Sequence, residues 1–101
     1  MIARIWRGET TAANADAYLD YLRRTSVAET PAIPGNCGMQ ILRRITGARA
    51  EFVTIILWES LDAIRAFAGA DIEKAVFYPE DDAYLISKEL TVAHYEVFGP
   101  A

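Results

Sequence analysis

The most apolar stretch of this 101-residue chain runs from Glu51 to Trp58. It lacks the polar alternation of a half-buried strand, so we predict a central strand whose two faces are both covered. Successive side chains of a strand point to opposite faces, and large apolar residues would therefore lie on both. Those on one face are Val53, Ile55 and Leu57, and those on the other are Phe52, Ile56 and Trp58. A fold that includes this strand has to supply cover for two apolar surfaces.

Two helices are expected from caps and apolar spacing. The first begins after the hydroxyl caps Thr10 and Thr11 and fades near residues 28–30. The second lies between Ser60, which caps its start, and Gly69, which suits the position after its last turn. Both helices carry apolar residues at the spacing of a single buried stripe.

The segment between the second helix and the last strand is less regular. We expect a short helix over residues 72–77, capped by Asp71. The acidic residues 80–82 follow Pro79 and could begin a further turn, and we interpret their side chains as solvated surface.

Alternation of β-favouring residues predicts three more strands, over residues 2–7, 39–45 and 91–98. The resulting order is strand, helix, strand, strand, helix, strand, within one domain over residues 1–101. This order predicts a ferredoxin-like βαββαβ fold of the α+β class, with a four-stranded antiparallel sheet and helices on one face. The helices leave the second apolar face of the sheet uncovered, so we expect a homodimer that packs sheet against sheet.

Composition excludes several classes of partner. The formal charge is −4, from 10 basic and 14 acidic residues, which argues against nucleic acid. The longest apolar run is far below the about 20 residues that a membrane span needs, and residues 1–6 read as a strand rather than a signal peptide. A single Cys37 excludes an intramolecular disulfide and a multi-cysteine metal site. We therefore expect a cytoplasmic protein that binds no metal, nucleic acid or membrane.

Several short motifs along nearly the whole chain resemble the antibiotic biosynthesis monooxygenase (ABM) superfamily. They are Arg4-Ile5-Trp6, Pro34-Gly35, Trp58-Glu59-Ser60, Ala63-Ile64-Arg65-Ala66-Phe67, Gly69-Ala70-Asp71 and His94-Tyr95-Glu96-Val97. The resemblance implies a dimeric α/β barrel, in which two ferredoxin-like subunits pack their sheets together. Its members include cofactor-independent oxygenases of phenols and haem-degrading oxygenases, because one scaffold hosts many chemistries.

The residues of this chain match the haem-degrading and the phenol-oxidising branches of the superfamily to different extents. Phe77 stands where the haem-degrading branch has its iron-ligating histidine, and Phe67 matches the tryptophan that distorts the haem. Phenylalanine cannot ligate iron, so we expect no haem and no other cofactor. The phenol-oxidising branch uses no metal or flavin, since the deprotonated substrate itself supplies electrons to oxygen.

Two polar residues are candidates for catalysis. Arg4 lies between apolar neighbours on the first strand, where a guanidinium could hold a phenolate, or could form a structural ion pair with Glu96 on the last strand. His94 is the single histidine, and it is either a general base or a packed strand residue with a local hydrogen bond.

A larger set is expected to bind the substrate, with a pocket between the sheet and the helices. These residues are Trp6, Tyr18, Trp58, Phe67, Phe77, Tyr78 and Glu96. The aromatic side chains could hold a flat ligand or could simply form core. The sequence thus predicts a cofactor-independent oxygenase-like enzyme that acts on a small aromatic or quinone-like molecule. The alternative is a non-catalytic, small-molecule-binding or stress-associated protein with the same dimeric fold.

Overall fold

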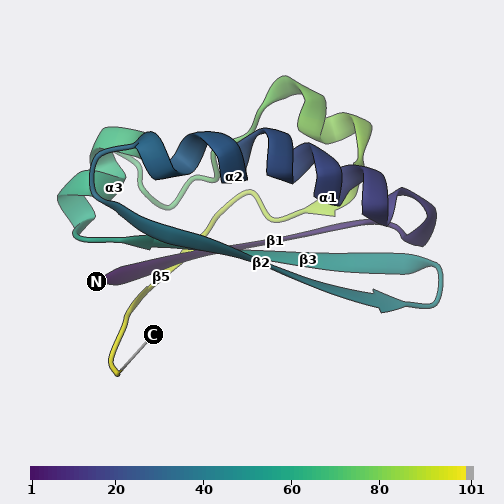
Figure 1. The fold of residues 1–101 in the computed structure, drawn as a ribbon, viewed down its shortest axis with the longest axis horizontal. Helices are drawn as coiled ribbons and strands as arrows, with labels where there is room; N and C mark the ends of the chain where they lie inside the picture. Colours follow the sequence, from purple (N-terminus) through teal and green to yellow (C-terminus); the bar gives the residue numbers. More distant parts are fainter. Residues whose placement is uncertain (100–101) are drawn as a thin grey trace.

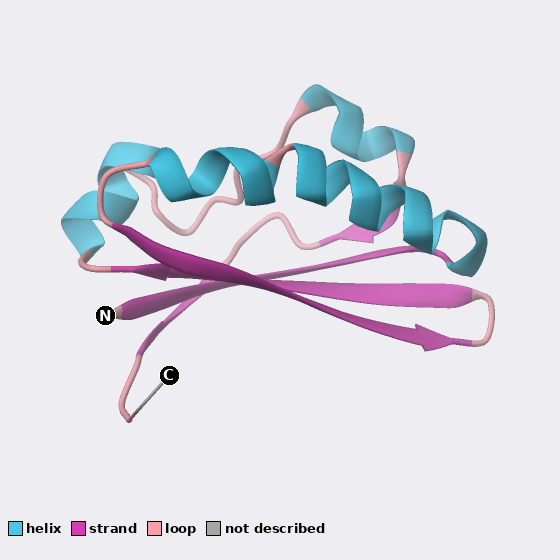
Figure 2. Cartoon of the chain, viewed as in Figure 1, coloured by secondary structure: helices cyan, strands magenta, loops and turns pink. Residues whose placement is uncertain are grey.

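An antiparallel sheet forms one layer of the molecule and helices form the other (Figures 1 and 2). The computed structural model describes residues 1–99. Its strands follow the order β2-β3-β1-β4, with β5 also paired to β1. They are β1 (Ile2–Thr11), β2 (Asn36–Thr46), β3 (Arg49–Trp58), β4 (Leu85–Lys88) and β5 (Ala93–Glu96). The predicted α+β, ferredoxin-like arrangement with helices on one face is confirmed.

The prediction that residues 51–58 form a central strand is confirmed. β3 pairs with β1 along its whole length on one side and with β2 on the other. Its side chains Phe52 and Trp58 face the helical layer and are completely buried. Val53 and Ile55, which point to the opposite face, are only partly covered within one chain. The two faces of β3 therefore differ: one is the protein core, and the other is an apolar surface.

Hydroxyl side chains accept hydrogen bonds at the start of two helical elements, η1 (Ala12–Asn14) and α3 (Leu61–Ala68). Thr11 accepts from the backbone N–H of Asn14, which shapes the short 3₁₀ turn η1 ahead of α1 (Ala15–Arg24). Ser60 accepts from the N–H of Ala63 at 3.1 Å, so the predicted cap of the second helix is confirmed. The remaining helical elements are α2 (Ser26–Glu29), η2 (Thr30–Ala32) and η3 (Pro79–Ala83).

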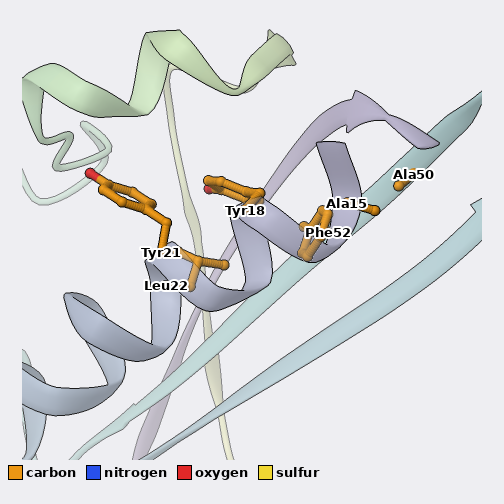
Figure 3. Packing of buried hydrophobic residues seen from close by; sticks show 6 residues of the cluster. All are labelled: Ala15, Tyr18, Tyr21, Leu22, Ala50 and Phe52. Atoms are coloured by element: carbon orange, nitrogen blue, oxygen red, sulfur yellow. The ribbon is translucent and has the colours of Figure 1, made fainter. Parts of the chain in front are cut away.

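The main core forms where α1 lies over β3 (Figure 3). Tyr18 meets Phe52 edge to face, with the two ring centroids 4.8 Å apart. Tyr21 stacks on Tyr84 at 4.9 Å, which ties α1 to the chain after η3. Burial of aromatic rings contributes much of the stability of a small core, and specific ring pairs add about 0.5–1.5 kcal/mol each. This core holds α1 at a fixed height above the sheet.

The structure corrects two expectations for the last third of the chain. Residues 72–77 form no helix, because their backbone pairs with the chain at residues 90–92 instead: the N–H of Ala75 donates to the carbonyl of Leu90, and that of Val92 to Glu73. The strand predicted over residues 91–98 is shorter and corresponds to β5, and it is preceded by β4, which was not predicted; both pair with β1. The residues between them leave the sheet and help to cover it.

Gly35, in the loop before β2, provides a test of how the layers fit together. Its φ is +85°, and an added Cβ would lie 2.5 Å from the Cβ of Ala63 in α3. We expect Gly35→Ala to lower the free energy of unfolding by about 2–4 kcal/mol, from backbone strain plus overpacking. Urea denaturation measures the change. Gly47→Ala is the matched control, because Gly47 also has positive φ, +60°, but has open space around it. An equal loss in both variants would contradict the contact with Ala63.

Candidate functional site

A cavity of about 90 Å³ lies between the sheet and the helical layer. Six of the nine residues proposed from the sequence line it: Arg4, Trp6, Tyr18, Phe67, Phe77 and Tyr78. Strand β1, helices α1 and α3, and the segment before η3 each contribute to this set. Tyr78 and the neighbouring lining residue Val76 are exposed and mark the side of the cavity that meets solvent.

Arg4 is the charged group on the sheet side of the cavity. It is only 4% exposed, although arginine is rarely buried without a partner. Its Nη1 donates to the carbonyl of Ile72 at 2.5 Å, and its Nη2 donates to the carbonyl of Lys74 at 2.8 Å. Its Cζ lies 5.9 Å from the ring centroid of Phe67. Within residues 1–99, no carboxylate oxygen lies within 4.0 Å of this guanidinium.

His94 lies directly opposite Arg4 in the pairing of β1 with β5. Its Nε2 is 3.0 Å from Nη1 of Arg4. A guanidinium can only donate, so Nε2 accepts this hydrogen bond and the proton of the neutral ring is on Nδ1. Burial, and then the charge of Arg4, lower the pKa of His94 below its ordinary value. His94 therefore holds Arg4 in place as a neutral acceptor, and it does not itself line the cavity.

The aromatic walls are fixed by contacts outside the cavity. Nε1 of Trp6 donates to the carbonyl of Glu89 at 2.7 Å, and the Trp6 ring meets Phe77 edge to face at 6.0 Å. The ammonium group of Lys88 lies over the ring of Phe77, 4.5 Å from its centroid. The ring of Trp6 also lies so close to Gly8 that an added Cβ there would fall 2.3 Å from it. Gly8 is thus required for this position of the indole.

Asp81 also lines the cavity, and the sequence interpretation of residues 80–82 as solvated surface is wrong for it. Its residue exposure is only 7%, whereas Glu80 and Asp82 are exposed. The backbone N–H of Tyr78 donates to Asp81 Oδ2 at 2.9 Å and fixes the carboxylate. One sequence signal could have singled out Asp81 from its neighbours. It lies two residues after Pro79, where an acidic side chain can reach back and accept a hydrogen bond at the helix start.

Three of the proposed residues are not brought to the cavity. Trp58 is completely buried behind Phe67, with ring centroids 5.1 Å apart, and belongs to the core. Glu96 is exposed and pairs with Ile2, so the expected Arg4–Glu96 ion pair is not formed. The third is His94, which reaches the site only through Arg4. The partner that Arg4 takes on the last strand is therefore the imidazole and not the carboxylate.

The state of His94 predicts a pH dependence of stability. Because its pKa is lower in the folded chain, the unfolded chain binds more protons as the pH falls below about 6.5, and the fold loses stability there. We expect the melting temperature to fall less steeply between pH 7 and pH 5 in His94→Gln, whose amide oxygen can accept from Arg4 without titrating. Calorimetry of both proteins across this range measures the difference. Identical slopes would contradict a neutral His94.

Comparisons with known proteins place the chain among similar folds. The family model described as antibiotic biosynthesis monooxygenase matches residues 1–77. A candidate monooxygenase of that name from Bacillus cereus has 13% identity and a TM-score of 0.68, with 99% of this chain and 97% of that chain covered. HapK from Hahella chejuensis has 16% identity and a TM-score of 0.67, with 100% and 96% covered. The haem-degrader MhuD from Mycobacterium tuberculosis has 21% identity and a TM-score of 0.61, with 100% and 99% covered. Curated protein sequences give no significant match.

Among residues 1–99, the cavity has no lining histidine or cysteine to ligate the iron of haem, which one of these similar structures binds. Phe77 offers no ligating atom. The lining residues Tyr18 and Tyr78 stay protonated, because burial raises the pKa of Tyr18 and a hydrogen bond to Glu29 raises that of Tyr78. A volume of about 90 Å³ is also well below the about 300–1,000 Å³ that holds drug-sized ligands. No cluster of three or more metal-ligating side chains occurs over residues 1–99. In that same part of the chain, no helix has the length and apolarity to cross a membrane.

Proposed function

The chain belongs to the antibiotic biosynthesis monooxygenase family, and from this premise we propose that it is a cofactor-independent oxygenase of small phenols or quinols. One observation carries the proposal: Arg4 is a buried cation on the cavity wall, and no carboxylate of residues 1–99 pairs with it. Removing a charge from water costs several kcal/mol unless an opposite charge meets it. An anionic ligand in the cavity supplies that charge.

The shape of the cavity favours a single aromatic ring. The volume of about 90 Å³ is smaller than the about 150 Å³ of an apolar protein cavity that binds benzene, so it excludes a polycyclic system and admits at most one ring, part of which would lie on the solvent side. The rings of Trp6 and Phe77 supply flat apolar walls, and Phe67 is in contact with the guanidinium of Arg4. A phenolate combines a flat apolar body with one concentrated negative charge. The apolar ring of a phenolate therefore matches the aromatic walls, and its charge matches Arg4.

The reaction needs only the substrate and molecular oxygen. The phenolate or quinolate supplies electrons to oxygen, one oxygen atom forms a bond to a ring carbon, and the other leaves as water. A hydroquinone then becomes a hydroxyquinone, with four electrons passing from the ring to oxygen. Arg4 stabilises the anion from which the electrons leave, and His94 holds Arg4 toward the cavity. The aromatic walls exclude bulk water, which strengthens the interaction of the anion with Arg4.

The proposal is tested with a panel of monocyclic phenols and quinols, including hydroquinone and 4-nitrophenol. Binding is followed by quenching of tryptophan fluorescence, since Trp6 lines the cavity. Turnover is followed by oxygen uptake above the rate of spontaneous oxidation, and the product is identified by mass spectrometry. Binding with incorporation of one oxygen atom supports the oxygenase. Binding without oxygen uptake would favour the non-catalytic binding protein, and failure of all these compounds to bind would contradict both.

We also propose that two copies of the chain pack their sheets together. The face of the sheet opposite the helices is free of covering elements in the described chain (Figure 1). The pairing register places six large apolar side chains on it: Ile5, Leu42, Val53, Ile55, Leu57 and Tyr95. Of these, Leu42 is 49% and Tyr95 57% exposed, and exposed apolar patches of this kind mark interfaces.

Sedimentation and light scattering test the dimer. We expect a dimer at micromolar concentration and an interface that buries well above about 1,200 Å². Ile55→Glu places a charge at the centre of the face and should give monomers. Leu90→Glu is the control, because Leu90 is 67% exposed and lies outside the strands. A monomeric wild-type protein would contradict the proposal.

We also propose that the protein is cytoplasmic, because the free, exposed Cys37 fits a reducing compartment.

A further inference from the structure

We infer that Asp81 is the catalytic base, which takes the phenolic proton of the substrate whose anion Arg4 then holds. This inference rests on the proposed function and adds to it the group that ionises the substrate. Asp81 lies beyond residue 77, where the match to the family model ends. Its role is therefore argued from this chain alone.

Asp81 and Arg4 reach the same cavity from different layers. Arg4 rises from β1 in the sheet, whereas Asp81 belongs to η3, the light-green turn above the helices in Figure 1. Both residues are more than nine-tenths buried. In the part of the chain described, no Lys, Arg or His nitrogen lies within 4.0 Å of the Asp81 carboxylate. The cavity thus holds one cation and one acid group, each without an ionic partner.

The other titratable groups of the cavity do not serve as a base. Besides Arg4 and Asp81, those that line it are Tyr18 and Tyr78. Both hydroxyls have a raised pKa and stay protonated near neutral pH: that of Tyr18 through burial first, and that of Tyr78, at about 12, through its hydrogen bond to Glu29 first. His94 already accepts from Arg4 at Nε2. Asp81 is the group left to accept a proton.

The surroundings of Asp81 suit a phenol. The backbone N–H of Tyr78 occupies Oδ2, which leaves Oδ1 free of backbone contacts. The hydroxyl of Tyr21 is buried and has no hydrogen-bond partner of good geometry in residues 1–99. Burial raises the pKa of Tyr21 first, and the Asp81 carboxylate raises it next as a hydrogen-bond acceptor of this hydroxyl, so the hydroxyl lies near the carboxylate. The carboxylate thus already lies among phenolic groups, and a substrate hydroxyl would be one more.

The proton transfer conserves charge within the cavity. The O–H bond of the phenol breaks, its electron pair stays on the phenol oxygen, and the proton forms a new bond to an oxygen of Asp81. The negative charge therefore moves from Asp81 to the substrate beside Arg4. After oxidation, Asp81 returns this proton to the oxygen atom that leaves as water, and the second proton of that water comes from the ring carbon to which the other oxygen atom has bonded.

The test counts protons during binding of 4-nitrophenol, whose phenolate absorbs visible light. At about pH 6, where the free probe is mostly neutral and carboxylates are ionised, absorbance reports the bound phenolate. Titration calorimetry in two buffers of different ionisation enthalpy reports the protons released. If Asp81 accepts the proton, the wild-type protein binds phenolate and releases no proton. In Asp81→Asn we expect either no phenolate or about one proton released for each phenolate formed.

The controls separate this inference from the proposed function. Asparagine at position 81 can still accept from the N–H of Tyr78, and Glu80→Gln changes an exposed neighbouring acid as a matched control. Release of about one proton per phenolate by the wild-type protein would overturn the role of Asp81, even if Asp81→Asn failed to fold. Equal proton release by the wild-type protein and Asp81→Asn would also overturn the role of Asp81. The same holds if the wild-type protein does not bind 4-nitrophenol. Absence of oxygen uptake, with the expected proton count, would contradict only the oxygenase.

Discussion

Replacing Arg4 by methionine is expected to reduce the affinity for 4-nitrophenolate by between about 30-fold and about 4,000-fold. Truncating one partner of a buried charge pair costs about 2–5 kcal/mol, which corresponds to that range. Methionine is an apolar side chain of similar length and offers no donor to an anion. Equilibrium binding, followed by the absorbance of the bound phenolate, measures the change.

Substitutions at Arg23 and at Arg4 itself serve as controls for this result. Arg23→Met removes an exposed arginine from α1 and should bind the probe as the wild-type protein does. Arg4→Lys retains the charge but cannot donate to both the Ile72 and Lys74 carbonyls in the manner of a guanidinium. We expect intermediate affinity for it. Unchanged affinity in a folded Arg4→Met protein would mean that no anion is bound at Arg4.

Replacing Phe52 by alanine should produce the largest loss of stability, about 3–5 kcal/mol. Phe52 is completely buried and forms the edge-to-face contact with Tyr18, so its removal leaves a cavity between α1 and β3. For a chain of this size, each kcal/mol lowers the melting temperature by roughly 4–8 °C. Differential scanning calorimetry should therefore show a decrease of at least about 12 °C.

The matched control for this core variant lies on the other face of the same strand. Val53→Ala removes a partly covered side chain next to Phe52 and should cost far less stability in one chain. In a dimer, Val53→Ala weakens association, so the two proteins are compared at the same concentration. Equal losses for the two variants would contradict the assignment of the core to the helical side of β3.

The sequence was sufficient for the features that depend on local pattern. The apolar run that ends at Trp58 gave the central strand, and a hydroxyl at Ser60 followed by a helical stripe gave the start of α3. The alternation of β1 placed Arg4 and Trp6 on one face, and both line the cavity. Each of these inferences needs only the period of a strand or a helix.

Features that depend on distant backbone pairing were not accessible in this way. Residues 72–77 carry an acceptable helical pattern, but the carbonyls of Ile72 and Lys74 accept from Arg4 about 70 residues earlier in the chain. Tertiary hydrogen bonds of this kind override local propensity. For Asp81, the position two residues after Pro79 was a local signal only for its contact with the start of η3. Its burial in the cavity wall depends on the elements that pack around it, and the sequence pattern does not show these.

The interruption between β4 and β5 bears on how a molecule enters the cavity. β4 and β5 span only four residues each, whereas β3 is paired along ten residues on both sides. Segments with few pairings open at a lower free energy than the rest of a domain, as separate cooperative units. We therefore expect the chain between β4 and β5, which is hydrogen-bonded to residues 73–75, to open at a lower free energy than the pairing of β3 with β1 and β2. Entry of a molecule on this side of the cavity would require such a local opening and no global unfolding.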